Sequence, residues 1–371
     1  MRIVLVIILS LFLQMSCRDV NTSTQAKDED FHTSSNSKVK GEEGIKIQFL
    51  ARNSPFVYDF VFSNGTVVGV GTGEKNRDDG LFVLNERTKS WDKQPVDSVT
   101  GSGLAINDIT LENDDIWIAG PAGLIMKKGE SDEHWRAMAR IPVLEATLID
   151  FADSRTAYIV SSAFNKRETG LRIFKTEDGG NSWKKVYENL IAGNPFDLAV
   201  IDANTVLIAM NDEYILRTEN GGVTWQPIEL EPTVEKIGSD DWIRLNRSGA
   251  SDLEISSNIC WVVGEKGSMY FSEDKGISWK RPIEMPVSVT GQSLRSIAFS
   301  PKGKGVSVGE NGYILVSEDF GKTWNELSSH LMKETILKKE AGDGNENLHK
   351  VKFIEENAII LGKNGVYRLS F

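Results

Sequence analysis

The sequence contains few of the residues from which metal sites and disulfide frameworks are built. It has two cysteines and four histidines in 371 residues, and no Cys–His spacing in it is typical of a zinc site. A basic excess is also missing: the formal net charge is −11, whereas a surface that binds phosphate is basic. We therefore expect no metal and no cofactor, and we do not expect nucleic acid as a partner.

Long helical periodicity is absent as well. The Gly-Gly pairs at 179–180 and 221–222 do not precede a helix, as a phosphate-binding loop would require. With 40% hydrophobic residues and 33 glycines, the composition allows one large β domain despite the length of the chain.

The first sixteen residues are typical of a signal peptide. Arg2 provides a positive start, and the apolar run Ile3–Leu13 is too short to span a membrane. The serine that precedes Cys17 makes the end of this run resemble a bacterial lipoprotein signal, which implies that Cys17 becomes the acylated first residue. Gln14 stands where such signals usually have an aliphatic residue, so an ordinary signal peptide with an incidental cysteine is the alternative.

Three segments follow from this pattern. Residues 1–16 are the predicted signal peptide, residues 17–44 a lipidated cysteine with a polar, disordered tether, and residues 45–371 a single β domain. If Cys17 carries lipid, Cys260 has no partner within the chain, and its apolar neighbours predict a packed thiol in a buried strand. The predicted location is the bacterial envelope, anchored to a membrane on its periplasmic or surface face.

One eight-residue pattern recurs along the domain. Ser272–Trp279 returns as Ser317–Trp324 and, more loosely, as Thr176–Trp183 and Thr218–Trp225. Its Asp can cap a turn, its Gly supplies a positive φ, and its Trp anchors the next strand. With two degenerate copies, the tryptophans fall at 91, 135, 183, 225, 279 and 324, a spacing that in an all-β chain is typical of propeller blades.

The two ends of the domain predict how the ring closes. After six blades, residues 349–354, 358–361 and 366–371 give only three strands, while residues 45–50 form a strand without a partner. The sequence therefore predicts an all-β, seven-bladed β-propeller of four-stranded antiparallel blades, closed by the N-terminal strand pairing into the last blade.

The repeated pattern resembles the Asp-box, or bacterial neuraminidase repeat, and the longer unit Val262–Trp279 resembles repeats of the photosystem II assembly and stability factor family. The second resemblance implies a scaffold that binds a protein or peptide. The first implies a structural role for the boxes and assigns to them Asp178, Asp274, Asp319, Trp183, Trp225, Trp279 and Trp324.

The name of the neuraminidase repeat raises an alternative, a sialidase-like glycoside hydrolase or a glycan-binding propeller. That chemistry needs a tyrosine nucleophile, an acid and an arginine cluster. Arg140, in an Arg-Ile-Pro triplet, matches the family only superficially, because it lies between the second and third blades rather than at the start of the domain. No catalytic residue is assigned, and a non-catalytic protein is favoured.

Long connections predict a binding surface. The segments 72–80, 162–170, 229–251 and 328–348 exceed the usual hairpin length and emerge on one face of the predicted ring, and the last of them begins with a predicted helix, Ser329–Lys339. Together with one residue of a first strand, Arg295, they supply the candidate binding residues Arg77, Asp78, Arg167, Trp242 and Arg244.

A second candidate site comes from the first strands, which line the channel of a propeller. When these strands are aligned, one position holds Asp59, Asp108, Asp197 and Asp252 in four blades, with Leu148, Ser296 and Lys350 in the others. This position predicts carboxylates around one mouth of the channel. They either bind a cation or a cationic peptide, or each accepts local backbone N–H bonds, and the second interpretation is favoured.

Overall fold

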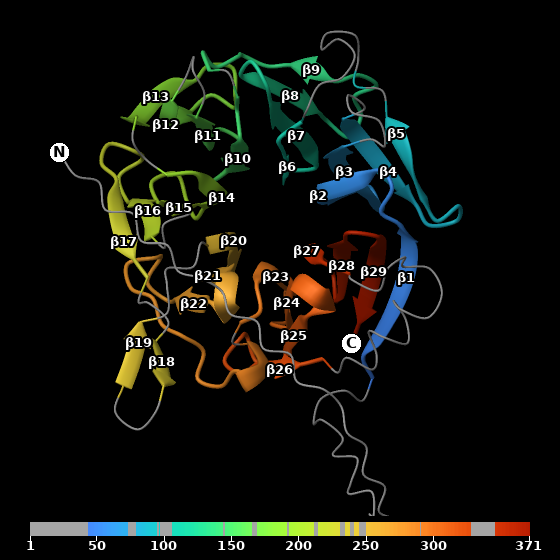
Figure 1. The fold of residues 1–371 in the computed structure, drawn as a ribbon. Helices are drawn as coiled ribbons and strands as arrows, with labels where there is room; N and C mark the ends of the chain where they lie inside the picture. Colours follow the sequence, from blue (N-terminus) through green and yellow to red (C-terminus); the bar gives the residue numbers. More distant parts are fainter. Residues whose placement is uncertain are drawn as a thin grey trace, which may run out of the picture. The chain divides into compact units, whose positions relative to one another are not determined.

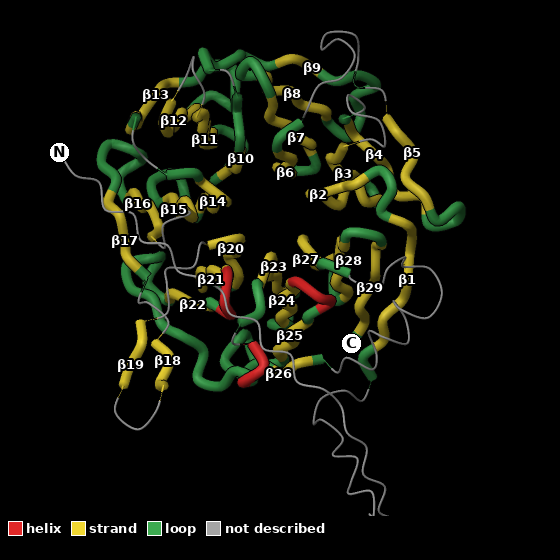
Figure 2. Tube along the Cα trace, in the orientation of Figure 1, coloured by secondary structure: helices red, strands yellow, loops and turns green. Residues whose placement is uncertain are grey.

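The computed structural model describes residues 44–371 apart from 73–78, 95, 97–105, 144, 165–168, 191–192, 211–213, 231–233, 238–240, 245–249, 290 and 328–345. Seven antiparallel sheets are arranged around a central opening, as Figure 1 shows. Figure 2 shows that the described chain is almost entirely strand and loop, with three 3-10 helices at Glu265–Gly267, Val287–Val289 and Glu310–Gly312.

The first three blades are regular four-stranded meanders. Their strands are β2 (Phe56–Ser63), β3 (Thr66–Thr72), β4 (Gly80–Asn85) and β5 (Ser90–Gln94); β6 (Asp108–Glu112), β7 (Asp115–Gly120), β8 (Leu124–Lys128) and β9 (Arg136–Ala137); and β10 (Leu148–Phe151), β11 (Ala157–Phe164), β12 (Thr169–Thr176) and β13 (Lys184–Asn189).

The fourth to sixth blades follow the same order. Their strands are β14 (Pro195–Val200), β15 (Val206–Met210), β16 (Tyr214–Thr218) and β17 (Gln226–Glu229); β20 (Ala250–Ser256), β21 (Ile259–Gly264) and β22 (Met269–Ser272); and β23 (Leu294–Phe299), β24 (Gly305–Gly309), β25 (Ile314–Ser317) and β26 (Asn325–Glu326). In the fifth blade the fourth strand is reduced to one antiparallel bridge between Phe271 and Lys280.

The seventh blade closes the ring as predicted. It combines β27 (Leu348–Ile354), β28 (Asn357–Gly362) and β29 (Gly365–Ser370) with the N-terminal strand β1 (Lys46–Arg52), which pairs with β29 from Lys46 opposite Ser370 to Arg52 opposite Gly365. The two ends of the domain lie side by side in Figure 1 as a blue and a red strand.

Tight turns set the hairpins between first and second strands. Asn64 and Gly65 have φ values of 51° and 72°, and Asn113 and Asp114 have 48° and 67°. Two consecutive positive φ values are typical of the type I′ turn, whose twist matches that of the flanking strands. This choice of residues explains why the predicted meanders form.

Apolar side chains between the blades hold the ring together. Every residue of β15 and of β24 is buried, because each sheet packs against a neighbouring blade on both faces. One cluster joins Val306 and Val308 of the sixth blade to Val351 and Ile360 of the seventh. Each such side chain stabilises the fold by about 1.5–3 kcal/mol.

The repeated turns carry one hydrogen-bond pattern. Asp274 Oδ1 accepts from the Ser272 hydroxyl at 2.7 Å and from the backbone N–H of Ser278 at 2.8 Å, while Asp274 Oδ2 accepts from the Ser278 hydroxyl at 2.6 Å. The same bonds recur in the turns that begin at Thr176 and Ser317. In the turn that begins at Thr218, Asn220 Oδ1 accepts the first two, and its Nδ2 donates to the Thr224 hydroxyl. These side chains are bonded within their own turns, between third and fourth strands.

The connection between the fourth and fifth blades differs from the expected long loop. It contains a separate hairpin of β18 (Val234–Ile237) and β19 (Asp241–Arg244), paired from Val234 opposite Arg244 to Ile237 opposite Asp241. Branched and aromatic residues favour strand conformation in both segments. Trp242 therefore lies on a strand, and the predicted helix Ser329–Lys339 lies outside the described residues.

Candidate binding site at the channel mouth

Five first strands contain a β-bulge near their start. In each, one residue drops out of register with the second strand, so that in β20 the pairing passes from Ala250 opposite Gly264 to Asp252 opposite Val263. A bulge re-aims the side chains beside it. The unpaired residues are Tyr58, Phe196, Ser251, Arg295 and His349. The next residues in these strands are Asp59, Asp197, Asp252, Ser296 and Lys350, which supports the alignment made from the sequence.

A cavity of about 320 Å³ lies among the first strands, and the five charged residues at the aligned channel position line it. They are Asp59, Asp108, Asp197, Asp252 and Lys350. Three further charged residues, Asp150, Glu254 and Lys352, also line the cavity and were not predicted. Each lies two positions beyond the aligned residue of its strand and hence on the same face, so the two-residue period was the signal that could have found it.

Carboxylates tie the second, third and fourth blades each to the next. Asp108 accepts a hydrogen bond at 2.7 Å from the backbone N–H of Ile149 in the third blade, and Asp197 accepts one at 2.7 Å from Leu253 in the fifth. In the third blade, where the aligned position is a leucine, Asp150 takes this role and accepts from Val200 at 2.8 Å. The favoured interpretation expected local donors, and Asp108 and Asp197 do each accept from the backbone N–H of the next residue, at 2.9 Å, in addition to these partners in the following blade.

Positive charge in the cavity comes from β27. Lys350 Nζ lies 2.7 Å from Asp252 Oδ1, and Lys352 Nζ lies 2.8 Å from Asp59 Oδ1. The remaining four carboxylates have no ion-pair partner among the described residues. They are Asp108, Asp150, Asp197 and Glu254. The lysines of the cavity thus lie in the seventh blade, whereas the second to fifth blades contribute carboxylates and no lysine to its lining.

Burial affects these two groups of carboxylates differently. It raises the pKa of Asp150 to about 6, of Asp197 to about 7 and of Glu254 to about 8, and it raises that of Asp108 well above its usual range. Burial would also raise the pKa of Asp59, but the attraction of Lys352 and Lys350 outweighs it, so that pKa is lowered. The carboxylates without a lysine are those that a further cation would stabilise in the charged form.

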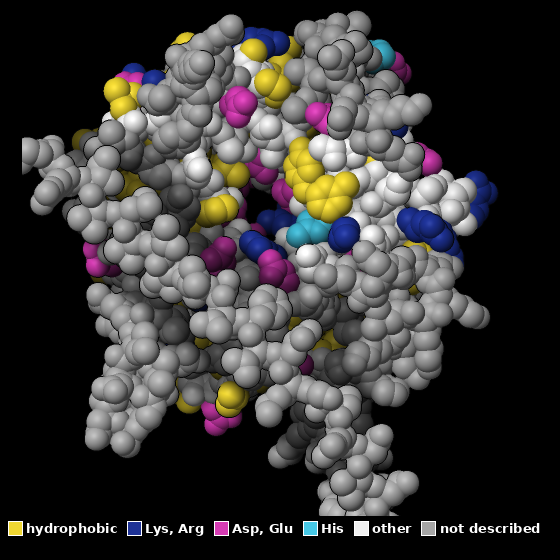
Figure 3. Space-filling view, viewed as in Figure 1, with side chains coloured by type: hydrophobic (Ala, Val, Ile, Leu, Met, Phe, Trp, Pro, Cys, Tyr) yellow, Lys and Arg dark blue, Asp and Glu magenta, His cyan; other side chains and the backbone are white. Residues whose placement is uncertain are grey.

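Aromatic side chains lie beside this charged cavity. Phe196, next to Asp197, is 50% exposed, and Phe56 is 40% exposed. The Phe56 ring lies 4.8 Å from the ring of His349, whose Nε2 is 3.0 Å from the carbonyl oxygen of Val57. Figure 3 shows a histidine, lysine or arginine, acidic and hydrophobic side chains gathered around the central opening.

Of the other predicted binding residues, the structure describes the side chain of Arg295 alone. Arg295 bonds to Glu310 and does not line the cavity. Arg77, Asp78 and Arg167 lie outside the described residues, and Trp242 and Arg244 are placed on β19 by their backbone alone. Arg140, the residue that matched the sialidase pattern, donates to the carbonyl of Ala122 at 3.1 Å, away from the cavity.

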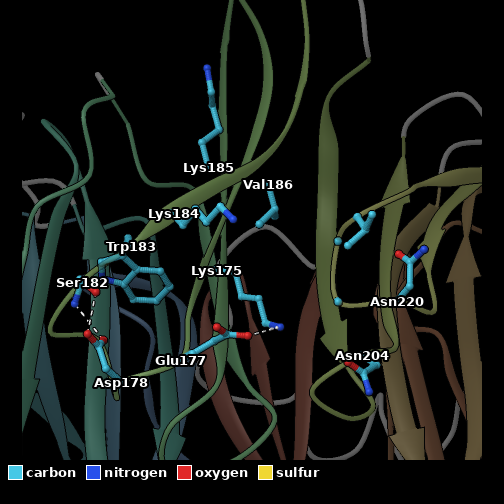
Figure 4. A pocket seen from close by; sticks show the side chains of 13 residues that line it. Lys175, Glu177, Asp178, Ser182, Trp183, Lys184, Lys185, Val186, Asn204 and Asn220 are labelled. Carbon is cyan, nitrogen blue, oxygen red and sulfur yellow. Dashed lines mark hydrogen bonds and ion pairs between the residues drawn. The ribbon is translucent and has the colours of Figure 1, made fainter.

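A larger groove, of about 720 Å³, lies between the third and fourth blades (Figure 4). The turns that begin at Thr176 and Thr218 line it together with the start of β13. Its polar groups already pair: Lys175 lies 2.9 Å from Glu177, and the Ser182 hydroxyl donates to Asp178. Because these polar groups pair with one another, the groove is a weaker candidate binding site than the channel mouth.

Within the described part of the chain, no three Asp, Glu, His or Cys side chains are placed to hold one metal ion. The same residues include no helix long and apolar enough to cross a bilayer.

These features define a seven-bladed β-propeller with a charged cavity at the mouth of its channel. No protein-family model matches the sequence. One curated protein to which it is similar over most of its length is the photosystem II assembly lipoprotein Ycf48 of a Synechococcus strain, 26% identical over 308 residues, or 82% of this chain and 80% of the relative. The Ycf48 of a Picosynechococcus strain is 26% identical over 205 residues, and the alignment spans 52% of this chain and 51% of that one, about half its length.

Solved structures show the same fold. A structure of YCF48 bound to D1 peptide has a TM-score of 0.62 and 16% identity, covering 88% of this chain and 94% of that one. YCF48 from Cyanidioschyzon merolae has a TM-score of 0.63 and 16% identity, with coverage of 88% and 99%. The chain is therefore a propeller of the kind seen in photosystem II assembly factors.

Proposed function

We propose that this protein is a non-catalytic scaffold that binds a protein or peptide at the mouth of its channel, on the face where the predicted insertions emerge. The observation that carries this proposal is the cavity itself, in which buried and half-buried carboxylates outnumber lysines beside exposed aromatic rings. The similarity to a YCF48 structure that holds a D1 peptide supports it.

Two finer features belong to the proposal, one for the repeated turns and one for the N-terminal segment. We propose that the repeated turns are Asp-boxes with a structural role, which the hydrogen bonds closed within each turn support. We also propose that Cys17 is acylated and tethers the ring to a membrane of the bacterial envelope. The name lipoprotein carried by two similar proteins supports this anchor.

Binding can be tested with the intact protein on an array of overlapping peptides from envelope proteins of the same organism. A set of bound peptides supports the proposal. A glycan array and a panel of glycosides, run in parallel, examine the alternative: sugar binding or release together with a silent peptide array would replace the scaffold by a glycan-active propeller.

The anchor needs a separate measurement. The intact protein and a Cys17→Ser variant are expressed in the same bacterium, and each is followed by membrane fractionation and mass spectrometry of the mature N-terminus. We expect acylation and membrane recovery of the first protein only. An unmodified N-terminus in both would show an ordinary signal peptide.

A further inference from the structure

The charges of the cavity are divided by blade. Lysine comes from β27, and both lysines already contact carboxylates, Asp252 and Asp59. The carboxylates of β6, β10, β14 and Glu254 of β20 face the same cavity without a cationic partner among the described residues. A ligand that enters on the side of the second to fifth blades therefore meets carboxyl groups that burial keeps partly protonated and that a cationic group would stabilise in the charged form.

The spacing of the carboxylates favours an elongated cation over a metal ion. The four unpaired groups are distributed over four first strands, and no three acidic, His or Cys side chains among the described residues are placed to hold one metal. A volume of about 320 Å³ is at the lower end of the range of roughly 300–1,000 Å³ for ligand pockets. A lysine or arginine side chain, whose terminal nitrogens offer several donors, fits this arrangement.

The residues beside the cavity favour a ligand that has an apolar group next to its cationic group. Phe196 and Asp197 are consecutive residues at the bulge of β14, and the first is half exposed while the second lines the cavity. Phe56 lies near the start of β2 and is also exposed, beside His349. Exposed aromatic rings at the rim of a charged pocket are typical anchor points of a recognition surface.

The carboxylates are held in place before any ligand arrives. Asp197 accepts hydrogen bonds from its neighbour Leu198 at 2.9 Å and from Leu253 at 2.7 Å, and Asp150 is held by Val200. Groups fixed by backbone donors lose little freedom on binding, which lowers the entropic cost of recognition.

From these four observations we infer that the channel mouth recognises a peptide segment in which a lysine or arginine adjoins a large apolar residue. The basic side chain enters the cavity toward Asp197 and Glu254, and the apolar side chain packs on Phe196. This inference rests on the proposed peptide-binding function and specifies its ligand.

The test uses the intact protein in detergent and fluorescence anisotropy with three labelled hexapeptides. One contains a central phenylalanine–arginine pair, the second has glutamine in place of arginine, and the third has alanine in place of phenylalanine. We expect the first to bind at least about tenfold more tightly than either of the others, because a hydrogen-bonded charge contributes about 1.5–3 kcal/mol.

Three variants locate the site. Asp197→Asn and Glu254→Gln remove a carboxyl group that a bound cation would ionise, with little change of shape, and Glu130→Gln removes the carboxyl of an exposed residue outside the cavity. Each of the first two should weaken the phenylalanine–arginine peptide about tenfold or more, and the third should not. Circular dichroism of each variant checks that the ring is intact.

The possible results separate the inference from the proposed function. Equal binding of the arginine and glutamine peptides, or unchanged binding by both cavity variants, would overturn the inference. If the array of envelope peptides yields binders without basic residues, the scaffold stands and its assigned ligand does not. If neither array nor hexapeptides bind, the scaffold itself fails.

Discussion

Lys350 of β27 reaches past β23 to Asp252 of β20, so that this ion pair joins the first strands of the seventh and fifth blades. The Asp252 side chain is only 5% exposed. Its other oxygen accepts from the backbone N–H of Ile297 at 2.9 Å and from the Ser296 hydroxyl at 2.8 Å, both in the intervening blade. One carboxylate thereby links three of the seven blades.

Replacing Asp252 by Asn should destabilise the ring. The substitution leaves the ammonium of Lys350 buried beside a neutral amide, and removing one partner of a buried ion pair costs about 3–5 kcal/mol. Urea unfolding measures the effect. The matched control is Glu273→Gln, which removes an exposed partner of Lys280 and should change the free energy of unfolding by about 1 kcal/mol or less. Equal losses in the two variants would contradict the linking role of Asp252.

Closure of the ring by β1 can be tested with two truncations. A chain that starts at residue 45 keeps all the described strands, whereas a chain that starts at residue 53 lacks β1 and exposes the edge of β29. β1 also contributes Leu50 and Ala51 to the core between the seventh and first blades. We expect cooperative thermal unfolding of the first chain and a much lower midpoint for the second. Identical midpoints would show that β1 does not close the ring.

Replacing a glycine of the repeated turns should destabilise the protein. Gly276 has a φ of 82°, and a Cβ atom there would lie 2.6 Å from Cδ2 of Leu207. Gly291 has a similar φ of 92° but no atom within 4 Å of that position, so Gly291→Ala measures the backbone strain alone. Gly276→Ala should lose about 1–3 kcal/mol more than this control in chemical unfolding, because the added methyl collides with a buried leucine. Equal losses would show that Leu207 moves aside freely.

Stability should fall as the pH rises from about 4 to 8. Asp197 and Glu254 have pKa values of about 7 and 8 in the folded protein, above the roughly 4 of an unfolded chain, so folding favours their protonated forms. Their contribution is greatest below pH 4 and is lost as the pH rises through the folded values. Glu254→Gln should flatten this decline when the thermal midpoint is followed from pH 5 to 8. A parallel decline in wild type and variant would contradict the raised pKa.

The repeated turns should show the opposite pH dependence, because their contribution to stability is lost as the pH falls. The pKa of Asp178 is lowered to about 2 by hydrogen bonds from Ser182, and that of Asp274 is about 2 because its bonds to Ser278 and Ser272 outweigh its slight burial. Stability from a lowered pKa is present above the unfolded value of about 4 and is lost as the pH falls toward 2. Asp274→Asn should therefore show a smaller loss than wild type between pH 4 and 2.

The sequence predicted the fold well because each blade carries its own turn and anchor, so repetition made the architecture visible without long-range information. Because the blades repeat, their first strands can also be aligned, and this alignment identified four carboxylates of the channel, Asp59, Asp108, Asp197 and Asp252. The alignment did not identify Asp150, Glu254 and Lys352, because it compares one position in each strand. Residues two positions apart in a strand share a face, so these three lie beside the aligned ones. The division of charge between blades could not be predicted, since it depends on which lysine reaches which carboxylate across the channel.

The central claim, that the channel mouth is the binding surface, is tested most directly by photo-crosslinking in cells that produce the protein. A photoreactive phenylalanine analogue replaces Phe196 in one protein and Val223, exposed in a turn at the other end of its blade, in a second. Our account predicts that position 196 captures peptides containing a basic residue beside an apolar one, and that position 223 does not. Capture of the same partner from position 223 alone would contradict it.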